Sequence, residues 1–132
     1  MHEAVPILRV GPDLLVTLQG DLDDLTVEAI EREVTAEVTR THAHGVLIDV
    51  SGLAVVDSFV ARVLARIVGM VRLLGADSTL VGIGPAVAIT LTELGASLDH
   101  VPTALTAEQG MAMLRHLRSA GTRTLMRHDS NR

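Results

Sequence analysis

The residues best placed to do chemistry stand at one strand-to-helix junction, between positions 46 and 64. There an apolar run ends at Asp49, a short loop follows, and Asp57-Ser58 opens an amphipathic pattern. A serine hydroxyl in the first turn of a helix can act as an N-cap by accepting a backbone N–H. The same position also suits a phosphate, because the helix dipole and the free amides stabilise negative charge there. Two interpretations of Ser58 stay open: a structural cap and a phosphorylation site.

A third interpretation, a nucleophilic Ser58, has less support. The chain has no Gly-x-Ser-x-Gly motif, and no histidine near Ser58 in the sequence could serve as its base. The chain also has no cysteine and no lysine, which excludes thiolate nucleophiles, thiolate metal sites and Schiff-base chemistry. We therefore expect no catalytic residue and no enzymatic activity.

Other polar motifs have structural explanations. The segment VGIGP at 81–85 resembles the start of a dinucleotide fingerprint, but it lacks the third glycine and ends in a proline without an N–H. It predicts a strand-to-helix turn. His42 and His44 have no carboxylate or thiolate beside them, which is typical of surface residues and not of a metal site. The acidic segment GDLDD at 20–24 predicts a turn and a helix cap. We expect no metal and no cofactor.

The composition disfavours two classes of partner, nucleic acids and membranes. The 132 residues suit one domain, and the net charge of -5 with 11 dispersed arginines disfavours a nucleic-acid surface. No apolar run is long enough to span a bilayer. The first ten residues show no basic segment followed by a long apolar one, so no secretory signal is expected. The expectation is a cytoplasmic chain that contacts neither nucleic acid nor membrane.

Hydrophobic periodicity predicts an alternating order of strands and helices. A hairpin around Gly11-Pro12 opens the chain, and the first helix has its apolar stripe at Leu25, Ile30, Val34 and Val38. The expected strands lie at 6–10, 13–19, 46–50, 78–83 and 98–101, and the expected helices at 25–41, 58–74, 85–94 and 107–118. The order β-β-α-β-α-β-α-β-α predicts an α/β fold with a mixed, mostly parallel sheet of four to five strands and about four helices. We expect one domain at 1–118 and a disordered polar tail at 119–132.

Several segments resemble the STAS-domain family of anti-sigma-factor antagonists, over about Pro6 to Leu117. The similarity includes DVS at 49–51, VDS at 56–58 and LDD at 22–24. The segments at 57–64, 85–95 and 103–110 are similar to the RsbS-like branch, the single-domain scaffolds of the stressosome. Sporulation-type antagonists usually carry Ser-Ser-Gly-Leu or Ser-Ala-Gly-Leu where this chain has Ser58-Phe59-Val60-Ala61. This difference favours the stressosome branch.

The resemblance implies a non-enzymatic scaffold. Proteins of this branch assemble with RsbR-type STAS paralogues into a large complex that sequesters an RsbT-like serine kinase. The kinase, which brings its own ATP and Mg²⁺, phosphorylates the serine matched by Ser58 and is released, and an RsbX-like phosphatase resets the site. The expected partner-binding residues are Asp57, Ser58, Phe59 and Arg62. The alternative is a simple anti-anti-sigma factor controlled by a switch kinase.

Overall fold

The computed structural model describes residues 5–93, 98 and 100–130. Its elements follow the predicted order. They are β1 (Ile7–Val10), β2 (Asp13–Gly20), α1 (Asp24–Thr41), β3 (Gly45–Leu53), α2 (Ser58–Leu73), β4 (Asp77–Val81), α3 (Pro85–Glu93), β5 (Thr103–Ala104) and α4 (Ala107–Ser130). The predicted α/β order of strands and helices is confirmed. The end expected for the third helix, at residue 94, lies outside the described residues.

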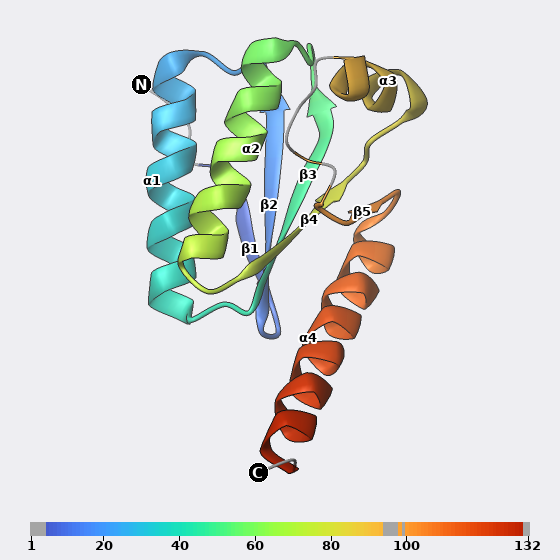
Figure 1. Ribbon diagram of the computed structural model, residues 1–132. Coiled ribbons are helices and arrows are strands. Elements are labelled where there is room, and N and C mark those ends of the chain that lie inside the picture. The colour runs from blue at the N-terminus through green and yellow to red at the C-terminus, as the bar shows by residue number, and fades with distance from the viewer. Residues whose placement is uncertain (1–4, 94–97, 99, 131–132) are drawn as a thin grey trace.

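The sheet contains the five strands in their sequence order, β1-β2-β3-β4-β5. Strand β1 pairs antiparallel with β2, while the pairs β2–β3, β3–β4 and β4–β5 are parallel. Helices α1 and α2 lie on one face, α4 lies on the other, and α3 lies at the end where the parallel strands finish (Figure 1). The sheet is therefore mixed and mostly parallel, as the sequence predicts.

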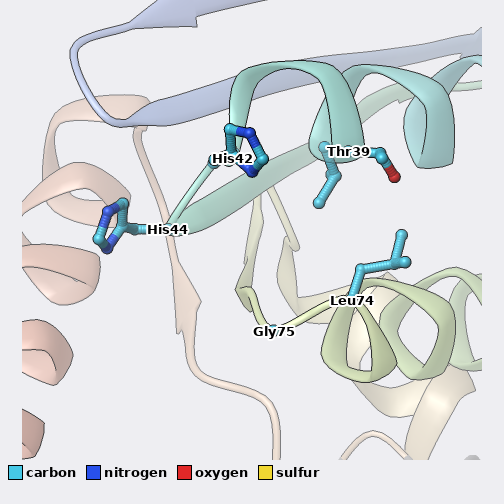
Figure 2. A pocket seen from close by; sticks show the side chains of 7 residues that line it. Thr39, His42, His44, Leu74 and Gly75 are labelled. Carbon is cyan, nitrogen blue, oxygen red and sulfur yellow. The ribbon is translucent and has the colours of Figure 1, made fainter.

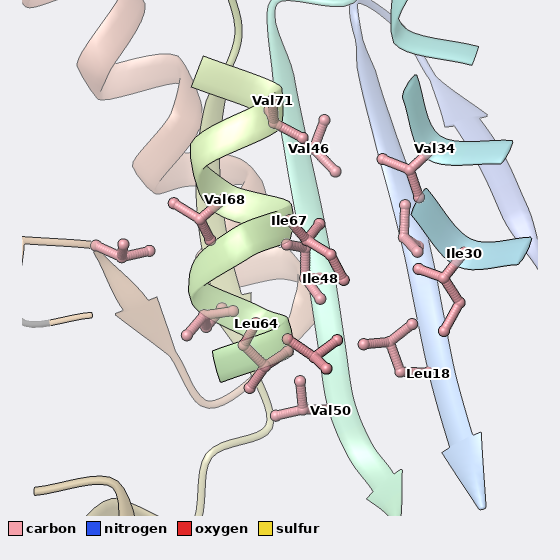
Figure 3. Close-up of a cluster of buried hydrophobic side chains, with 14 of the residues drawn as sticks. Leu18, Ile30, Val34, Val46, Ile48, Val50, Leu64, Ile67, Val68 and Val71 are labelled. Atoms are coloured by element: carbon pink, nitrogen blue, oxygen red, sulfur yellow. The ribbon is translucent and has the colours of Figure 1, made fainter. Parts of the chain in front are cut away.

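The core lies on both faces of the sheet. The larger part fills the space between the sheet and helices α1 and α2, where Ile48 of β3, Ile67 of α2 and Ile30 of α1 are buried (Figure 3). On the opposite face, Leu47 of β3 packs with Val81 and with Leu114 of α4. Strand β3 is covered on both sides, which explains why its sequence is continuously apolar and does not alternate.

The last helix is longer than its sequence pattern predicts. The apolar stripe ends near Arg118, yet α4 continues to Ser130. The disorder expected of the tail at 119–132 stays a prediction. The physical reason is that extending a docked helix by one residue needs no new nucleus, so a polar segment can continue it without an apolar face. The domain boundary at residue 118 stays a prediction. Within the described ranges, no helix has both the length and the hydropathy of a membrane span.

The last strand is displaced from its predicted position. The apolar segment expected as a strand at 98–101 turns back, with the Val101 N–H bonding the Leu98 carbonyl at 3.0 Å, and both side chains are buried. Pairing with β4 begins only at Thr103 and includes two residue pairs. Pro102 has no N–H to donate to a ladder, so the strand starts after it.

Candidate functional site

Helix α2 is capped by Asp57 and not by Ser58. The Asp57 backbone is extended, and its Oδ1 accepts a hydrogen bond from the Val60 N–H at 3.0 Å. Its carbonyl accepts the first intrahelical bond, from the Ala61 N–H, at 2.9 Å. Ser58 is therefore the first residue inside the helix. Capping as the role of Ser58 is thus wrong, because the neighbouring carboxylate reaches the free amide instead.

The Ser58 side chain is exposed, and its hydroxyl makes no hydrogen bond within the described part of the chain. The backbone amides of Ser58 and Phe59 lie in the first turn, where a helix offers no internal acceptor. On either side of Ser58, the side chains of Val56 and Phe59 are half-buried and pack against the core. The hydroxyl is thus held at the surface by two apolar anchors, beside amides that favour negative charge.

The loop before α2 is fixed by hydrogen bonds at the end of strand β3. The Ala54 N–H bonds the Gly20 carbonyl of β2 at 3.0 Å. Asp49 Oδ1 accepts two bonds from Ser51, from its N–H at 2.9 Å and from its hydroxyl at 2.7 Å. Asp49 lies in the middle of β3, so its carboxylate holds Ser51, two residues further along the same strand, and is not free for chemistry at the strand end.

Three helices begin at this same edge of the sheet. The N-termini of α1, α2 and α3 all lie where the parallel strands finish (Figure 1). Exposed carboxylates gather on this edge, at Asp21, Asp23, Asp24 and Asp57. Arg62 is exposed and stands four residues after Ser58, so both lie on the same face of α2. The edge is acidic around Ser58, with one guanidinium a turn away.

Exposed apolar side chains on the same edge were missed by sequence reasoning. Leu25 in the first turn of α1 is 61% exposed, Val55 before α2 is 57% exposed, and Ile89 in α3 is 59% exposed. Leu25 was expected in the buried stripe of the first helix. It lies about 200° around the helix axis from the buried Val27, which turns it away from the sheet. The one sequence signal of this exposure is the position of Leu25 on a helical wheel, nearly opposite Val27.

Of the predicted partner-binding residues, the structure brings all four onto the first turns of α2. Asp57, Ser58 and Arg62 are exposed, while Phe59 is half-buried and packs inward. Their role in binding stays a prediction. No described side chain is hydrogen-bonded to Ser58, and no described group of three His, Cys, Asp or Glu residues could hold a metal ion. The chemistry that the geometry offers is that of a hydroxyl open to a partner.

His42 and His44 lie just before the start of β3, at the end of the sheet opposite Ser58. Figure 2 shows the His42 and His44 side chains directed apart, around a pocket of about 280 Å³ between the ends of α1 and α2. Both side chains are exposed, as predicted for surface residues. The nine residues of β3 separate them from the Ser58 edge by roughly 30 Å. Neither can serve as a base for Ser58.

The remaining motifs have the predicted structural roles. Asp23 caps α1, with its Oδ1 accepting the Thr26 N–H at 2.7 Å. The segment 81–85 is the turn from β4 into α3, and Pro85 is the first residue of that helix. Gly82 has φ +83° there, a left-handed conformation that disfavours other residues.

The fold and the site define an α/β domain that presents an exposed serine at a helix N-terminus. The STAS domain family model matches residues 4–110, and the chain belongs to this family. Two Bacillus subtilis relatives are the RsbT co-antagonist proteins RsbRC, 33% identical over 98 residues, and RsbRA, 33% identical over 109 residues. The matches cover 74% and 82% of this chain but only 35% and 40% of the relatives, so the chain spans well under half of their length.

Solved structures agree with this assignment. The Moorella thermoacetica RsbS variant S58E is 40% identical, with a TM-score of 0.78, and the match covers 89% of this chain and 99% of that one. A chain in a solved structure of the stressosome is also 40% identical, with a TM-score of 0.74. That match covers 86% of this chain and 98% of the stressosome chain. The anti-sigma factor antagonist SpoIIAA shares the fold at 16% identity. The chain is thus a STAS domain similar to RsbS.

Proposed function

We propose that this chain is a non-enzymatic stressosome scaffold that sequesters an RsbT-like serine kinase and releases it when Ser58 is phosphorylated. The observation that carries the proposal is the Ser58 hydroxyl, which is exposed and has no partner among the described residues, because Asp57 performs the capping. In support, relatives include RsbS, a stressosome chain and RsbT co-antagonists. The RsbS structure carries the substitution S58E, which adds a negative charge to a serine position.

Phosphoryl transfer forms a bond from Ser58 Oγ to the γ-phosphorus of ATP and breaks the bond to ADP, with the hydroxyl proton released. The new phosphate adds about -1.5 to -2 charges at neutral pH. It meets the free amides of the first turn of α2, which favour it, and the Asp57 carboxylate, which does not. The helix can therefore keep its fold while the charge changes at the edge of the sheet around Ser58.

Arg62 gives the switch a second component. It lies one turn along from Ser58, and its guanidinium makes no ion pair in the described residues. A phosphate on Ser58 falls within the i,i+4 range of that guanidinium. Arg62 is then available to an acidic partner in the unmodified state and is occupied by the phosphate afterwards. Release of the kinase follows from the loss of this contact and from like-charge repulsion at the edge.

The first test is phosphorylation in vitro by the cognate kinase with ATP, followed by mass spectrometry. One phosphate on Ser58 is expected for the wild type and none for Ser58→Ala. Ser51→Ala is the matched control, since Ser51 is also exposed near the loop but its hydroxyl is bound to Asp49. It should be phosphorylated like the wild type. Phosphate found on any other residue would contradict the site.

The second test is capture of the kinase, measured by co-elution. Ser58→Ala should retain it and Ser58→Glu should weaken it, whereas equal binding by both variants would exclude a charge switch. Arg62→Gln should weaken capture by unmodified chain and reduce the further loss on phosphorylation.

The third test separates the scaffold from a simple anti-anti-sigma factor. Light scattering of this chain mixed with an RsbR-type paralogue should show an assembly far larger than a dimer. A small complex would favour the simpler antagonist. A serine hydrolase would instead label at Ser58 with a fluorophosphonate.

A further inference from the structure

Strand β1 is an edge of the sheet, and one side of it has no strand partner in the part of the chain that the structure describes. The Thr17 N–H of β2 bonds the Pro6 carbonyl at 3.1 Å, one step before the first paired residue of β1. In an antiparallel pair, residues that bond the partner strand alternate with residues whose backbone faces away from it. Leu8 therefore bonds β2, while Ile7 and Arg9 direct their N–H and C=O groups to the open side.

The open segment is limited at both ends. Before it, the Val5 N–H bonds Glu33 Oε2 of α1 at 2.9 Å. After it, the chain enters the hairpin turn at 11–12. Within the described ranges, the backbone groups of Ile7 and Arg9 have no hydrogen bond on the open side. Unpaired N–H and C=O groups along an edge are a template for a further strand.

A row of leucines leads to this edge on the α4 face of the sheet. Leu47 of β3, Leu15 of β2 and Leu8 of β1 lie opposite one another in register, so their side chains share one face. Leu47 is buried against α4, Leu15 is half-buried beside it, and Leu8 is 61% exposed. Val10, the next residue of β1 on that face, is 37% exposed. The apolar row thus begins in the core and ends in solvent at the edge.

The charged residue of β1 does not protect this face. Natural sheets often keep an edge free of partners with charged side chains. Arg9 points to the opposite face from Leu8, because successive residues of a strand alternate. Its Nε donates to the Gly11 carbonyl at 3.3 Å, so the guanidinium follows its own chain toward the turn. On the α4 face, β1 presents only Leu8 and Val10, which are both apolar.

We propose that the open edge of β1 pairs antiparallel with β1 of a second copy of this chain, across a two-fold axis at Leu8. In this register the Ile7 backbone bonds the Arg9 backbone of the second copy, and the reverse, so each outward group of both residues gains a partner. Leu8 lies opposite Leu8 of the second copy, which makes the leucine row continuous. A two-fold contact requires a surface that is complementary to itself, and this edge is such a surface.

The contact is small, because β1 contributes only four residues from each copy. A stable complex buries roughly 1,200 to 2,000 Å², so we expect a dimer that forms only as concentration rises. The edge lies on the opening hairpin, whereas Ser58 begins α2. The pairing therefore does not depend on the proposed kinase switch. It is tested on the unmodified chain without a kinase, so its failure would leave that switch untouched.

The first test is sedimentation velocity of the full chain over a wide range of concentrations, with a shift from monomer to dimer expected. Leu8→Lys places like charges opposite each other across the axis and should stay monomeric throughout. Leu8 is exposed, so this variant should fold normally, which thermal unfolding checks. Leu73→Lys is the matched control: Leu73 ends α2, is 89% exposed and should leave the dimer intact. Equal loss in both variants would show non-specific association and overturn the edge.

The second test separates the backbone from the side chains. Arg9→Pro removes an outward N–H without removing a bond to β2 and should abolish the dimer, whereas Arg9→Ala keeps the N–H and should retain it. By hydrogen exchange, the Ile7 and Arg9 amides should gain protection only at dimer concentrations, and the Leu8 amide should be protected at all of them.

A chain that is monomeric at every concentration would overturn the proposal. So would a dimer that both Leu8→Lys and Arg9→Pro leave intact. Association only with an RsbR-type paralogue, lost in Leu8→Lys, would overturn the second copy as the occupant of the edge.

Discussion

Arg118 of α4 donates a hydrogen bond to Asp13 of β2 at 2.6 Å and joins two positions 105 residues apart. The Asp13 side chain is fully buried, whereas that of Arg118 is 26% exposed. The second carboxylate oxygen, Asp13 Oδ2, has no partner in the described residues. Arg118 is therefore the only described ion-pair partner of a buried charge, and it attaches α4 to the sheet.

Removal of this guanidinium should be costly. Arg118→Leu leaves the Asp13 carboxylate buried and unpaired, and we expect a loss of about 2 to 4 kcal/mol in the free energy of unfolding. Urea denaturation measures it. Arg115→Leu, at an exposed position on the same helix, is the control and should change stability by less than about 0.5 kcal/mol. A similar effect of both substitutions would show that the pair does not anchor α4.

Asp57 and Ser58 should differ sharply in their effect on stability. Asp57→Ala removes the α2 cap and should lower the free energy of unfolding by about 1 kcal/mol, while Asp57→Asn should retain most of it. Ser58→Ala should change stability by less than about 0.5 kcal/mol, because its hydroxyl is unengaged in the described structure. Thermal unfolding monitored by circular dichroism distinguishes them. If Ser58→Ala were as damaging as Asp57→Ala, the cap would have been assigned to the wrong residue.

Gly82 should not tolerate a side chain. It has φ +83°, and an added Cβ would stand 2.7 Å from Ser51 Cβ and 3.0 Å from Asp49 Oδ1. We expect Gly82→Ala to destabilise the fold by about 2 kcal/mol, through backbone strain and crowding. Gly84→Ala, in the same turn, meets nothing within 4 Å and should have little effect. Denaturant midpoints of the two variants measure the difference, and equal midpoints would contradict the prediction.

Two helical glycines should respond in opposite directions to alanine. At Gly110 of α4, an added Cβ would stand 2.8 Å from Leu47 Cδ2 and 2.9 Å from Val81 Cγ2. Overpacking of about 1 to 3 kcal/mol should outweigh the gain of nearly 1 kcal/mol in helix propensity. At Gly69 of α2 nothing lies within 4 Å, so alanine should stabilise by about 0.5 to 1 kcal/mol. Stabilisation at both positions would mean that α4 sits farther from the sheet.

The sequence by itself determined the order of strands and helices and the position of Ser58. Both depend on local signals, namely hydrophobic periodicity and the turn and cap residues, which act over a few positions. The uninterrupted apolar run at 46–48 also indicated a strand covered on both faces, and Leu47 and Ile48 are buried on opposite sides. The role of the 20–24 segment as a turn and helix cap followed from the residue types that favour capping.

Only the tertiary structure decided which oxygen caps α2, where the last strand lies and which apolar residues stay exposed. Asp57 and Ser58 are both good caps by residue type. The chain is extended at Asp57 as it enters the helix, so the Asp57 carboxylate reaches the Val60 N–H and becomes the cap. Leu98 and Val101 are buried in a turn, which an apolar pattern cannot distinguish from a strand. The pairing of Asp13 with Arg118 depends on contacts between distant segments, which no local pattern records.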